Sequence, residues 1–164
     1  MKRALFIGRF QPFHKGHLQV VKDISKKYDD VIIGIGSSQE KFTKENPFSY
    51  SARKIMISNT LKNNKIKNIK IYPIPDLYND KKWVDYVRNN LPKFDAVYTG
   101  NKWTYECFKK FNFKVKKIRL VRGINSTIIR ERMANGKPWK NLVPKEIYAF
   151  IVKINGVERL KKLR

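Results

Sequence analysis

The chain has 164 residues, of which 41% are hydrophobic and 13% aromatic, and its formal net charge is +24 at pH 7. This length suits one domain with a buried core, and the even mixture of charged and apolar residues excludes a disordered or fibrous protein. A single cysteine, Cys107, excludes a disulfide within the chain and the usual cysteine-based zinc sites. No apolar run is long enough for a signal peptide or a membrane span, so we expect the protein to reside in the cytoplasm without membrane partners.

The strong positive charge allows two interpretations. A basic field attracts polyanions, which would suit a nucleic-acid-binding module. However, the lysines are spread over every predicted helix and loop, and no basic block alternates with aromatic residues as on an RNA-stacking surface. We therefore favour a lysine-rich composition like that of many thermophilic proteins, and we expect no specific nucleic-acid partner.

Strand-like and helix-like segments alternate along the chain. Runs rich in β-branched residues cover 3–7, 31–35, 69–74, 96–99 and 115–121. Helical patterns cover 17–28, 51–62, 83–91, 102–111, 127–135 and 145–154. Such alternation predicts an α/β fold around a parallel sheet of about five strands. We expect one domain over 1–164, with an αβ core at 1–136 and a C-terminal helical extension at 137–164 that divides near Gly156.

The first predicted strand ends in a loop that carries glycine and proline and leads into a helix. This segment reads Gly8-Arg9-Phe10-Gln11-Pro12-Phe13-His14-Lys15-Gly16-His17. Free amide N–H groups and the positive end of the helix dipole make such a helix start an anion site. Gly16 lets a phosphate approach the backbone, and His14, His17 and Arg9 add side-chain donors.

These two histidines are the only ones in the chain, and they fall together at a strand-to-helix junction. A purely structural role would have His14 cap the helix and His17 pack below the sheet edge. We favour a functional role, in which both imidazoles bind one phosphoryl group. The chemistry that this predicts is phosphoryl or nucleotidyl transfer, in which the protein positions substrates and stabilises growing charge.

A second helix start carries hydroxyl groups and an arginine, in the order Asn125-Ser126-Thr127-Ile128-Ile129-Arg130. Hydroxyl residues at such a position are usually only caps. Here Thr127 and Arg130 share one face of the helix, so a hydroxyl, free amides and a guanidinium can hold a polyphosphate together. We expect this helix start to lie opposite the histidines and to bind the leaving end of a nucleoside triphosphate.

Ligands of open parallel sheets bind beyond the carboxyl ends of the strands, so the loops that follow Ile7, Ile35, Ile74 and Thr99 should converge. The last three loops give weaker signals, each with an ordinary structural explanation. The residues concerned are Gly34, Gly36 and Ser37 in a tight turn, Asp76 and Asp80 as a cap or solvated acid, Trp83 as a core residue, and Gly100 and Asn101 in a turn.

Taken together, these segments resemble the HxGH nucleotidyltransferase superfamily. Residues 8–17 match the extended form GRFQPFHxGH, which is similar to archaeal nicotinamide mononucleotide (NMN) adenylyltransferases in particular. The match continues at 34–37, 46–48, 83, 99–101, 127–130 and 155–160, which spans nearly the whole chain, and no KMSKS-like motif of class I tRNA synthetases is present. The resemblance implies a Rossmann-like three-layer fold. It also implies transfer of AMP from ATP to NMN, which yields NAD and pyrophosphate by direct in-line attack.

The resemblance also implies roles for individual residues. The catalytic residues would be His14, His17, Arg9 and Arg130. ATP would be bound by Gly8, Arg9, Phe10, His14, Gly16, His17, Gly100, Asn101, Ser126, Thr127 and Arg130. NMN would be bound by Gly36, Ser37, Asp76, Asp80 and Trp83, with the Trp83 indole stacked on the cationic nicotinamide ring. Magnesium would accompany ATP and be held mainly by its phosphates rather than by a protein metal site.

Two positions depart from the family pattern. Asn125 stands where the second motif usually has serine, and Glu45 stands where some relatives have a basic residue, so neither receives a role. The family is commonly a homohexamer, which implies a homo-oligomer here. The residues themselves lead only to nucleotidyl transfer, and the resemblance supplies the acceptor. Flavin mononucleotide (FMN) and phosphopantetheine are the alternative acceptors.

Overall fold

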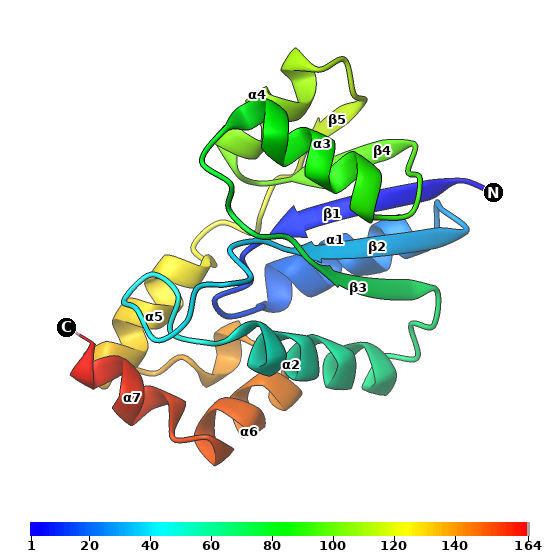
Figure 1. The fold of residues 1–164 in the computed structure, drawn as a ribbon. Helices are drawn as coiled ribbons and strands as arrows, with labels where there is room; N and C mark the ends of the chain where they lie inside the picture. The colour runs from blue at the N-terminus through cyan, green and yellow to red at the C-terminus, as the bar shows by residue number, and fades with distance from the viewer. Residues whose placement is uncertain (164) are drawn as a thin grey trace.

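The structure, a computed structural model, describes residues 1–163, and a five-stranded parallel sheet forms its middle layer (Figure 1). The strands are β1 (Arg3–Gly8), β2 (Asp30–Ile35), β3 (Ile69–Pro73), β4 (Ala96–Thr99) and β5 (Val115–Lys117), in the order β3-β2-β1-β4-β5. The helices are α1 (Lys15–Ser25), α2 (Tyr50–Asn63), α3 (Asp80–Asn90), α4 (Lys102–Lys110), α5 (Ser126–Ala134), α6 (Lys145–Lys153), α7 (Gly156–Lys162) and a 3₁₀ turn, η1 (Lys140–Leu142). The predicted α/β fold with five parallel strands is confirmed.

Helices cover both faces of the sheet because its strands are apolar on both faces. In β1, Ala4 and Phe6 belong to a core with side chains of α1, α2, α5 and α6. Leu5 and Ile7 point to the opposite face and pack with side chains of α3 and α4. Figure 1 shows the resulting three layers, with α3 and α4 on one side of the sheet and α2 and the C-terminal helices on the other.

The C-terminal helices return to the body of the molecule. α6 packs against α2, and α7 packs against α5. The two helices are separated by Asn155, which has a left-handed backbone with φ 53°, and by Gly156. A Cβ atom on Gly156 would lie 2.9 Å from Ile151 Cγ2, so the break needs glycine for close packing, while Asn155 supplies the left-handed turn. The predicted division at Gly156 is confirmed.

One predicted strand is too long. The prediction extends it to Val121, whereas β5 ends at Lys117. The reason is the length of its neighbour: Lys117 pairs with Thr99, the last residue of β4, so the segment that follows has almost no strand to bond with. It leaves the sheet after one further hydrogen bond, from the Ile118 amide to the Thr99 carbonyl at 3.0 Å.

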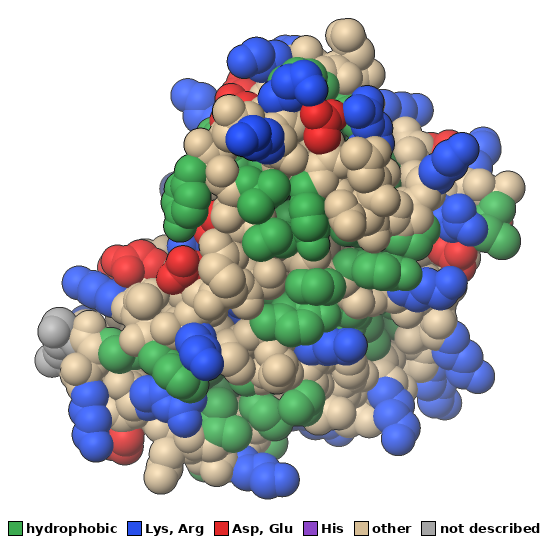
Figure 2. Space-filling model, in the orientation of Figure 1, with side chains coloured by type: hydrophobic (Ala, Val, Ile, Leu, Met, Phe, Trp, Pro, Cys, Tyr) green, Lys and Arg blue, Asp and Glu red, His purple; other side chains and the backbone are tan. Residues whose placement is uncertain are grey.

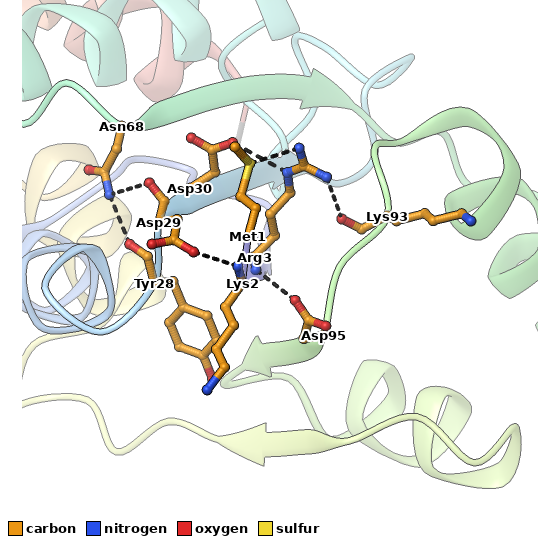
Figure 3. Close-up of polar contacts among 9 residues, drawn as sticks. All are labelled: Met1, Lys2, Arg3, Tyr28, Asp29, Asp30, Asn68, Lys93 and Asp95. Carbon is orange, nitrogen blue, oxygen red and sulfur yellow. Dashed lines mark hydrogen bonds and ion pairs between the residues drawn. The ribbon is translucent and has the colours of Figure 1, made fainter.

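Polar contacts fix the amino ends of the strands (Figure 3). The backbone N–H of Lys2 donates to Asp29 at 2.6 Å, and that of Arg3 donates to Asp95 at 2.7 Å. The amide of Asn68 donates to three carbonyls in the segment 25–29, at 3.1 to 3.2 Å. Protein groups therefore occupy the amino edge of the sheet, whereas the carboxyl edge carries the loops that contain the predicted site residues.

Lysine and arginine side chains lie all around the visible face of the molecule rather than in one patch (Figure 2). This spread agrees with the even distribution of lysines along the sequence. Within residues 1–163 no helix is both long and apolar enough to cross a bilayer.

Candidate active site

The two histidines lie at the start of α1 and bind each other's backbone. His14 is the N-cap residue, and His17 occupies the third position of the helix. The His17 amide donates to Nδ1 of His14 at 3.4 Å, and the His14 amide donates to Nδ1 of His17 at 3.2 Å. This is a reciprocal capping box in which imidazoles replace the usual hydroxyl and carboxylate. It stacks the two rings, whose centroids are 3.6 Å apart.

Both imidazoles are neutral at physiological pH. Because each Nδ1 accepts a backbone hydrogen bond, the ring proton of each histidine must be on Nε2. Burial lowers the pKa of His14 to about 4. Burial, together with the His14 ring, lowers the pKa of His17 well below its ordinary value. Both rings are therefore suited to donate an Nε2–H hydrogen bond and poorly suited to carry a positive charge.

Gly16 packs tightly against this histidine pair. A Cβ atom at this position would lie 3.0 Å from Cε1 and 3.1 Å from Nδ1 of His14, so a larger residue would force the His14 ring to shift by a few tenths of an ångström. His14 Nε2 is buried and has no hydrogen-bond partner among residues 1–163, so its N–H is unsatisfied by the protein.

The N-terminus of α5 is bound to the loop that leads into α1. The Ser126 hydroxyl donates to the Pro12 carbonyl at 3.0 Å, and Nη1 of Arg130 donates to the Gln11 carbonyl at 2.9 Å. Nη2 of Arg130 lies 3.4 Å from the Thr127 hydroxyl, so the predicted pairing of these two side chains on one face is confirmed. The two helix starts that the sequence places opposite each other are therefore neighbours.

A cavity of about 470 Å³ lies where these helix starts meet the loop after β4. Its lining includes nine of the residues predicted to bind ATP: Gly8, Arg9, Phe10, His17, Gly100, Asn101, Ser126, Thr127 and Arg130. His14 and Gly16 are buried beside it and are not part of the lining. A second cavity of about 700 Å³ shares Arg9, Thr127 and Arg130 and continues toward α7. One concave, basic region thus contains or adjoins every predicted ATP residue.

The predicted acceptor residues lie at the ends of β2 and β3. Gly36 donates its amide to the Gly8 carbonyl at 2.9 Å, which places the loop after β2 directly beside the loop after β1. Ser37 is buried beside it, and Asp76 follows β3. Trp83 is only 2% exposed and belongs to the core between the sheet, α3 and α4. The structure brings these residues to the expected edge of the sheet, although the Trp83 ring is covered by protein.

A buried arginine that the sequence analysis missed joins these loops. Arg53 on α2 is 0% exposed, and its guanidinium donates to the carbonyls of Arg9 at 2.7 Å, Gly36 at 2.8 Å and Ser37 at 3.0 Å. Burial, and then the charge of Arg9, lower the pKa of Arg53 to about 10, which still leaves it cationic. A signal was present: at helical spacing Arg53 shares a face with the buried residues of α2, Met56, Ile57, Thr60 and Leu61.

Gln11 was also missed as a positioning residue. Its side-chain amide donates to the Phe48 carbonyl at 2.8 Å and accepts from the Phe48 amide at 3.0 Å. This pair fixes the histidine loop to the segment before α2. A buried glutamine in a glycine- and proline-bearing loop has no periodic signal that would reveal such a partner.

The donor set of the cavity fits phosphate more closely than it fits a bare metal ion. Among residues 1–163 no three His, Cys, Asp or Glu side chains gather as metal ligands do. The lining offers Arg9, Arg130, the His17 ring and the amides at the start of α5, with Glu131 as an acid in the lining. Such groups bind a polyphosphate, and a divalent cation would then be coordinated mainly by the phosphate oxygens.

Comparison with known proteins finds one family model and several enzymes of the same name that are similar to this chain. The family model described as cytidylyltransferase-like matches residues 5–132. The nicotinamide-nucleotide adenylyltransferase of Thermoplasma acidophilum is 43% identical, over 99% of this chain and 92% of the relative. The enzymes of that name from Methanococcus maripaludis and Pyrococcus furiosus are 44% and 40% identical, over 98% and 99% of this chain and 95% and 89% of the relatives.

Solved structures agree with the sequence relatives. A bifunctional NMN adenylyltransferase/ADP ribose pyrophosphatase from Francisella tularensis superposes with a TM-score of 0.86 at 29% identity and covers 99% of this chain. The same bifunctional protein complexed with AMP and a manganese ion gives a TM-score of 0.83. This chain spans about half the length of that protein, 52% and 51% in the two structures. The chain therefore belongs to the cytidylyltransferase-like family and, within it, to the nicotinamide-nucleotide adenylyltransferases.

Proposed function

We propose that the chain transfers the adenylyl group of ATP to NMN, which forms NAD and releases pyrophosphate. Family membership supports the reaction, and one structural observation supports the site: the N-termini of α1 and α5 are hydrogen-bonded together beside one cavity. One helix start carries imidazole donors, and the other carries a guanidinium and hydroxyls. A triphosphate can therefore lie between them, with its α-phosphate near His17 and its tail near Arg130.

The histidines act as hydrogen-bond donors and not as bases. An oxygen of the NMN phosphate attacks the α-phosphorus of ATP, and the bond from that phosphorus to the bridging oxygen breaks as pyrophosphate leaves. The attacking oxygen is already anionic at neutral pH, so no proton has to be removed. Neutral Nε2–H groups on His14 and His17 stabilise the charge that grows on the α-phosphoryl oxygens, and their low pKa keeps them in this form.

The remaining predicted residues hold the two substrates. Arg9, Thr127 and Arg130 bind the β- and γ-phosphates, together with the amide N–H groups at the start of α5. The Gly100 and Asn101 backbone contacts adenosine, and the loop residues Gly8, Phe10 and Gly16 shape the phosphate site. Magnesium would be held mainly by the phosphate oxygens of ATP, beside Arg9 and Arg130, and would supply positive charge that offsets the charge of the polyphosphate.

NMN binds at the ends of β2 and β3 in this proposal. Gly36 and Ser37 face the reacting phosphates from the loop that Arg53 holds in place, while Asp76, Asp80 and Trp83 bind the ribose and the nicotinamide ring. This arrangement places the acceptor on the opposite side of the histidines from the triphosphate tail, as in-line attack requires.

Three further properties belong to the same proposal. Residues 1–164 act as one domain, supported by the packing of α6 on α2 and of α7 on α5. The chain assembles into a homo-oligomer, a hexamer by family resemblance, which sedimentation analysis would test. The enzyme resides in the cytoplasm, where ATP and NMN are available.

Offering one acceptor at a time tests the reaction. Purified protein is incubated with ATP and magnesium and with NMN, FMN or phosphopantetheine, and both pyrophosphate and the dinucleotide mass are measured. We expect NAD from NMN and no product from the other two acceptors. Pyrophosphate with FMN or phosphopantetheine, but none with NMN, would contradict the assigned acceptor while leaving the adenylyl-transfer site in place.

A further inference from the structure

The cavity of about 700 Å³ extends beyond the groups that the proposed function assigns to the ATP tail. It shares Arg9, Thr127 and Arg130 with the cavity at the histidines, and it then continues between the loop after β2, α5 and the end of α7. In the proposed function the terminal phosphates of ATP end at these shared residues. A volume of several hundred cubic ångströms is typical of a site for a small organic molecule. The cavity therefore offers space for a group that follows the γ-phosphate.

The wall opposite α5 is fixed by contacts between distant segments. Two hydrogen bonds within residues 43–46, at 3.0 and 3.2 Å, close a turn that carries Lys44 and Glu45 at its tip. Just before this turn, the Arg159 guanidinium of α7 lies over the Phe42 ring, 4.7 Å from its centroid. Figure 1 shows the loop beside α5, and the turn and α5 line the cavity together. The outer part of the cavity is thus a built site rather than a gap beneath a free loop.

The chemistry of the lining changes beyond the shared residues. Lys44 continues the row of cations that begins with Arg9 and Arg130. The other side chains there include a carboxylate and three apolar groups. The residues that line this cavity, and not the one at the histidines, are Lys44, Glu45, Ala134, Asn135, Leu160 and Leu163.

This lining suits a nucleoside better than a longer chain of phosphates. A bare phosphate would gain nothing from Leu160 and Leu163, and the Glu45 carboxylate would repel it. A nucleobase can bury apolar surface against the two leucines, and ribose hydroxyls can donate to a carboxylate. Lys44 can bind the phosphate that precedes such a nucleoside. A polyphosphate that carries a nucleoside at each end combines all of these groups.

We propose that the chain also uses dinucleoside polyphosphates as adenylyl donors, with the second nucleoside between the 43–46 turn and α7. This proposal rests on the proposed function, because the first nucleoside and its α-phosphate occupy the site of ATP. Diadenosine tetraphosphate is the donor that we choose to test. Its chain places one phosphate beyond the γ-position of ATP, near Lys44, and the second adenosine follows against Leu160 and Leu163.

The reaction needs no further reactant. An oxygen of the NMN phosphate bonds to the phosphorus attached to the first adenosine, and the bond from that phosphorus to the next bridging oxygen breaks. The bridging oxygen keeps the electron pair, so the products are NAD and ATP instead of NAD and pyrophosphate. The negative charge of the attacking oxygen passes to the terminal phosphate of the leaving ATP, and no proton is transferred.

A comparison of three donors tests the second nucleoside. ATP, adenosine 5′-tetraphosphate and diadenosine tetraphosphate are each incubated with NMN and magnesium, and NAD and the leaving group are separated by chromatography at initial rates. We expect diadenosine tetraphosphate to yield NAD and ATP in equal amounts. Its KM should be about tenfold lower than that of adenosine 5′-tetraphosphate, because only the dinucleotide buries a second base against apolar side chains.

Two variants test the lining itself. Lys44→Ala and Leu163→Ser should each raise the KM for diadenosine tetraphosphate about tenfold, and by more than they raise the KM for ATP. Lys41→Ala, in the same loop but outside the lining, and Val152→Ser, at an exposed position of α6, are the matched controls. Titration calorimetry without NMN gives a readout that does not depend on turnover, and both variants should weaken binding of diadenosine tetraphosphate relative to their controls.

The outcomes separate this proposal from the proposed function. If ATP and NMN yield no NAD, the proposed function fails and this proposal fails with it. If ATP yields NAD but diadenosine tetraphosphate yields neither NAD nor ATP, only the second donor is wrong. If diadenosine tetraphosphate reacts no better than adenosine 5′-tetraphosphate and the two variants match their controls, the cavity does not bind a second nucleoside.

Discussion

Replacing Arg53 by methionine should loosen both loops that begin the active site. The guanidinium is wholly buried and donates to four backbone carbonyls, those of Arg9, Gly36, Ser37 and, through Nε at 3.3 Å, Ser49. Methionine matches the aliphatic part of the arginine side chain, so the substitution keeps the packing of that part and removes the guanidinium with its hydrogen bonds. The loop carbonyls are left buried without donors.

The expected loss of stability follows from these contacts. A hydrogen bond to a charged group contributes about 1.5–3 kcal/mol, and removal of the buried cation returns part of its desolvation cost. We therefore expect the free energy of unfolding to fall by about 3–5 kcal/mol, with the lower figure favoured if water reaches the carbonyls. At about 2–4 °C per kcal/mol for a chain of this size, Tm should fall by roughly 6–20 °C.

Thermal unfolding followed by circular dichroism measures the loss, and steady-state kinetics measures its effect on the site. KM should rise for both substrates, because Arg53 holds one loop of each binding region. Arg88→Met is the matched control, since Arg88 is exposed and pairs with Asp85 on the surface of α3. The Arg88→Met substitution should lower the free energy of unfolding by less than about 1 kcal/mol. If the Arg53→Met protein has the same Tm as the Arg88→Met control and keeps both KM values, the reasoning is refuted.

Four other predictions concern the histidine pair, the second helix start and the amino edge of the sheet. His17→Ala should lower kcat by roughly 10²–10³-fold, as expected for loss of a preorganised donor, with an unchanged circular dichroism spectrum, and retained turnover would contradict the site. Because the folded pKa of His14 is about 4 and that of His17 is also lowered, the unfolded chain binds more protons below pH 6.5. Stability to urea should therefore fall as the pH is lowered from about 6.5 to 4, and a His14→Gln, His17→Gln double variant should lose less over this range. Arg130→Lys keeps the charge but not the bidentate geometry, so kcat/KM for ATP should drop about tenfold or more in initial-rate assays, and an unchanged value would remove Arg130 from the phosphate site. Asn68→Ala should lower the free energy of unfolding by about 1–2 kcal/mol in chemical denaturation and leave turnover at 25 °C unaltered.

The sequence alone was sufficient to predict the fold and the edge of the sheet at which the loops converge. Alternating segments of β-branched and amphipathic residues allow few arrangements other than a parallel sheet, and the carboxyl ends of parallel strands share one edge. The prediction that the helix starts carrying His14 and Arg130 face each other is confirmed by the hydrogen bonds that join them.

The remaining features depend on contacts between distant segments. The extended run after Lys117 has the composition of a strand, but whether it pairs depends on where β4 ends, which its own residues do not encode. Helical spacing places Arg53 on the buried face of α2, but its hydrogen-bond acceptors lie in two other loops, so its partners could not be predicted from its own segment. Trp83 was assigned a stacking role, and only the packing of α4 on α3 reveals that Trp103 covers it.

The order of the strands also bears on how the enzyme forms during its synthesis. β1 leaves the ribosome first, yet it lies at the centre of the sheet, between β2 and β4. One of its edges waits unpaired until the segment from Ala96 has emerged. The imidazoles belong to the early half of the chain, whereas Gly100, Asn101 and Arg130 belong to the late half. In the proposed site, a nucleotide would therefore stabilise the chain only after the segment through Arg130 has been synthesised, and a shorter product would gain no protection from the substrate pool.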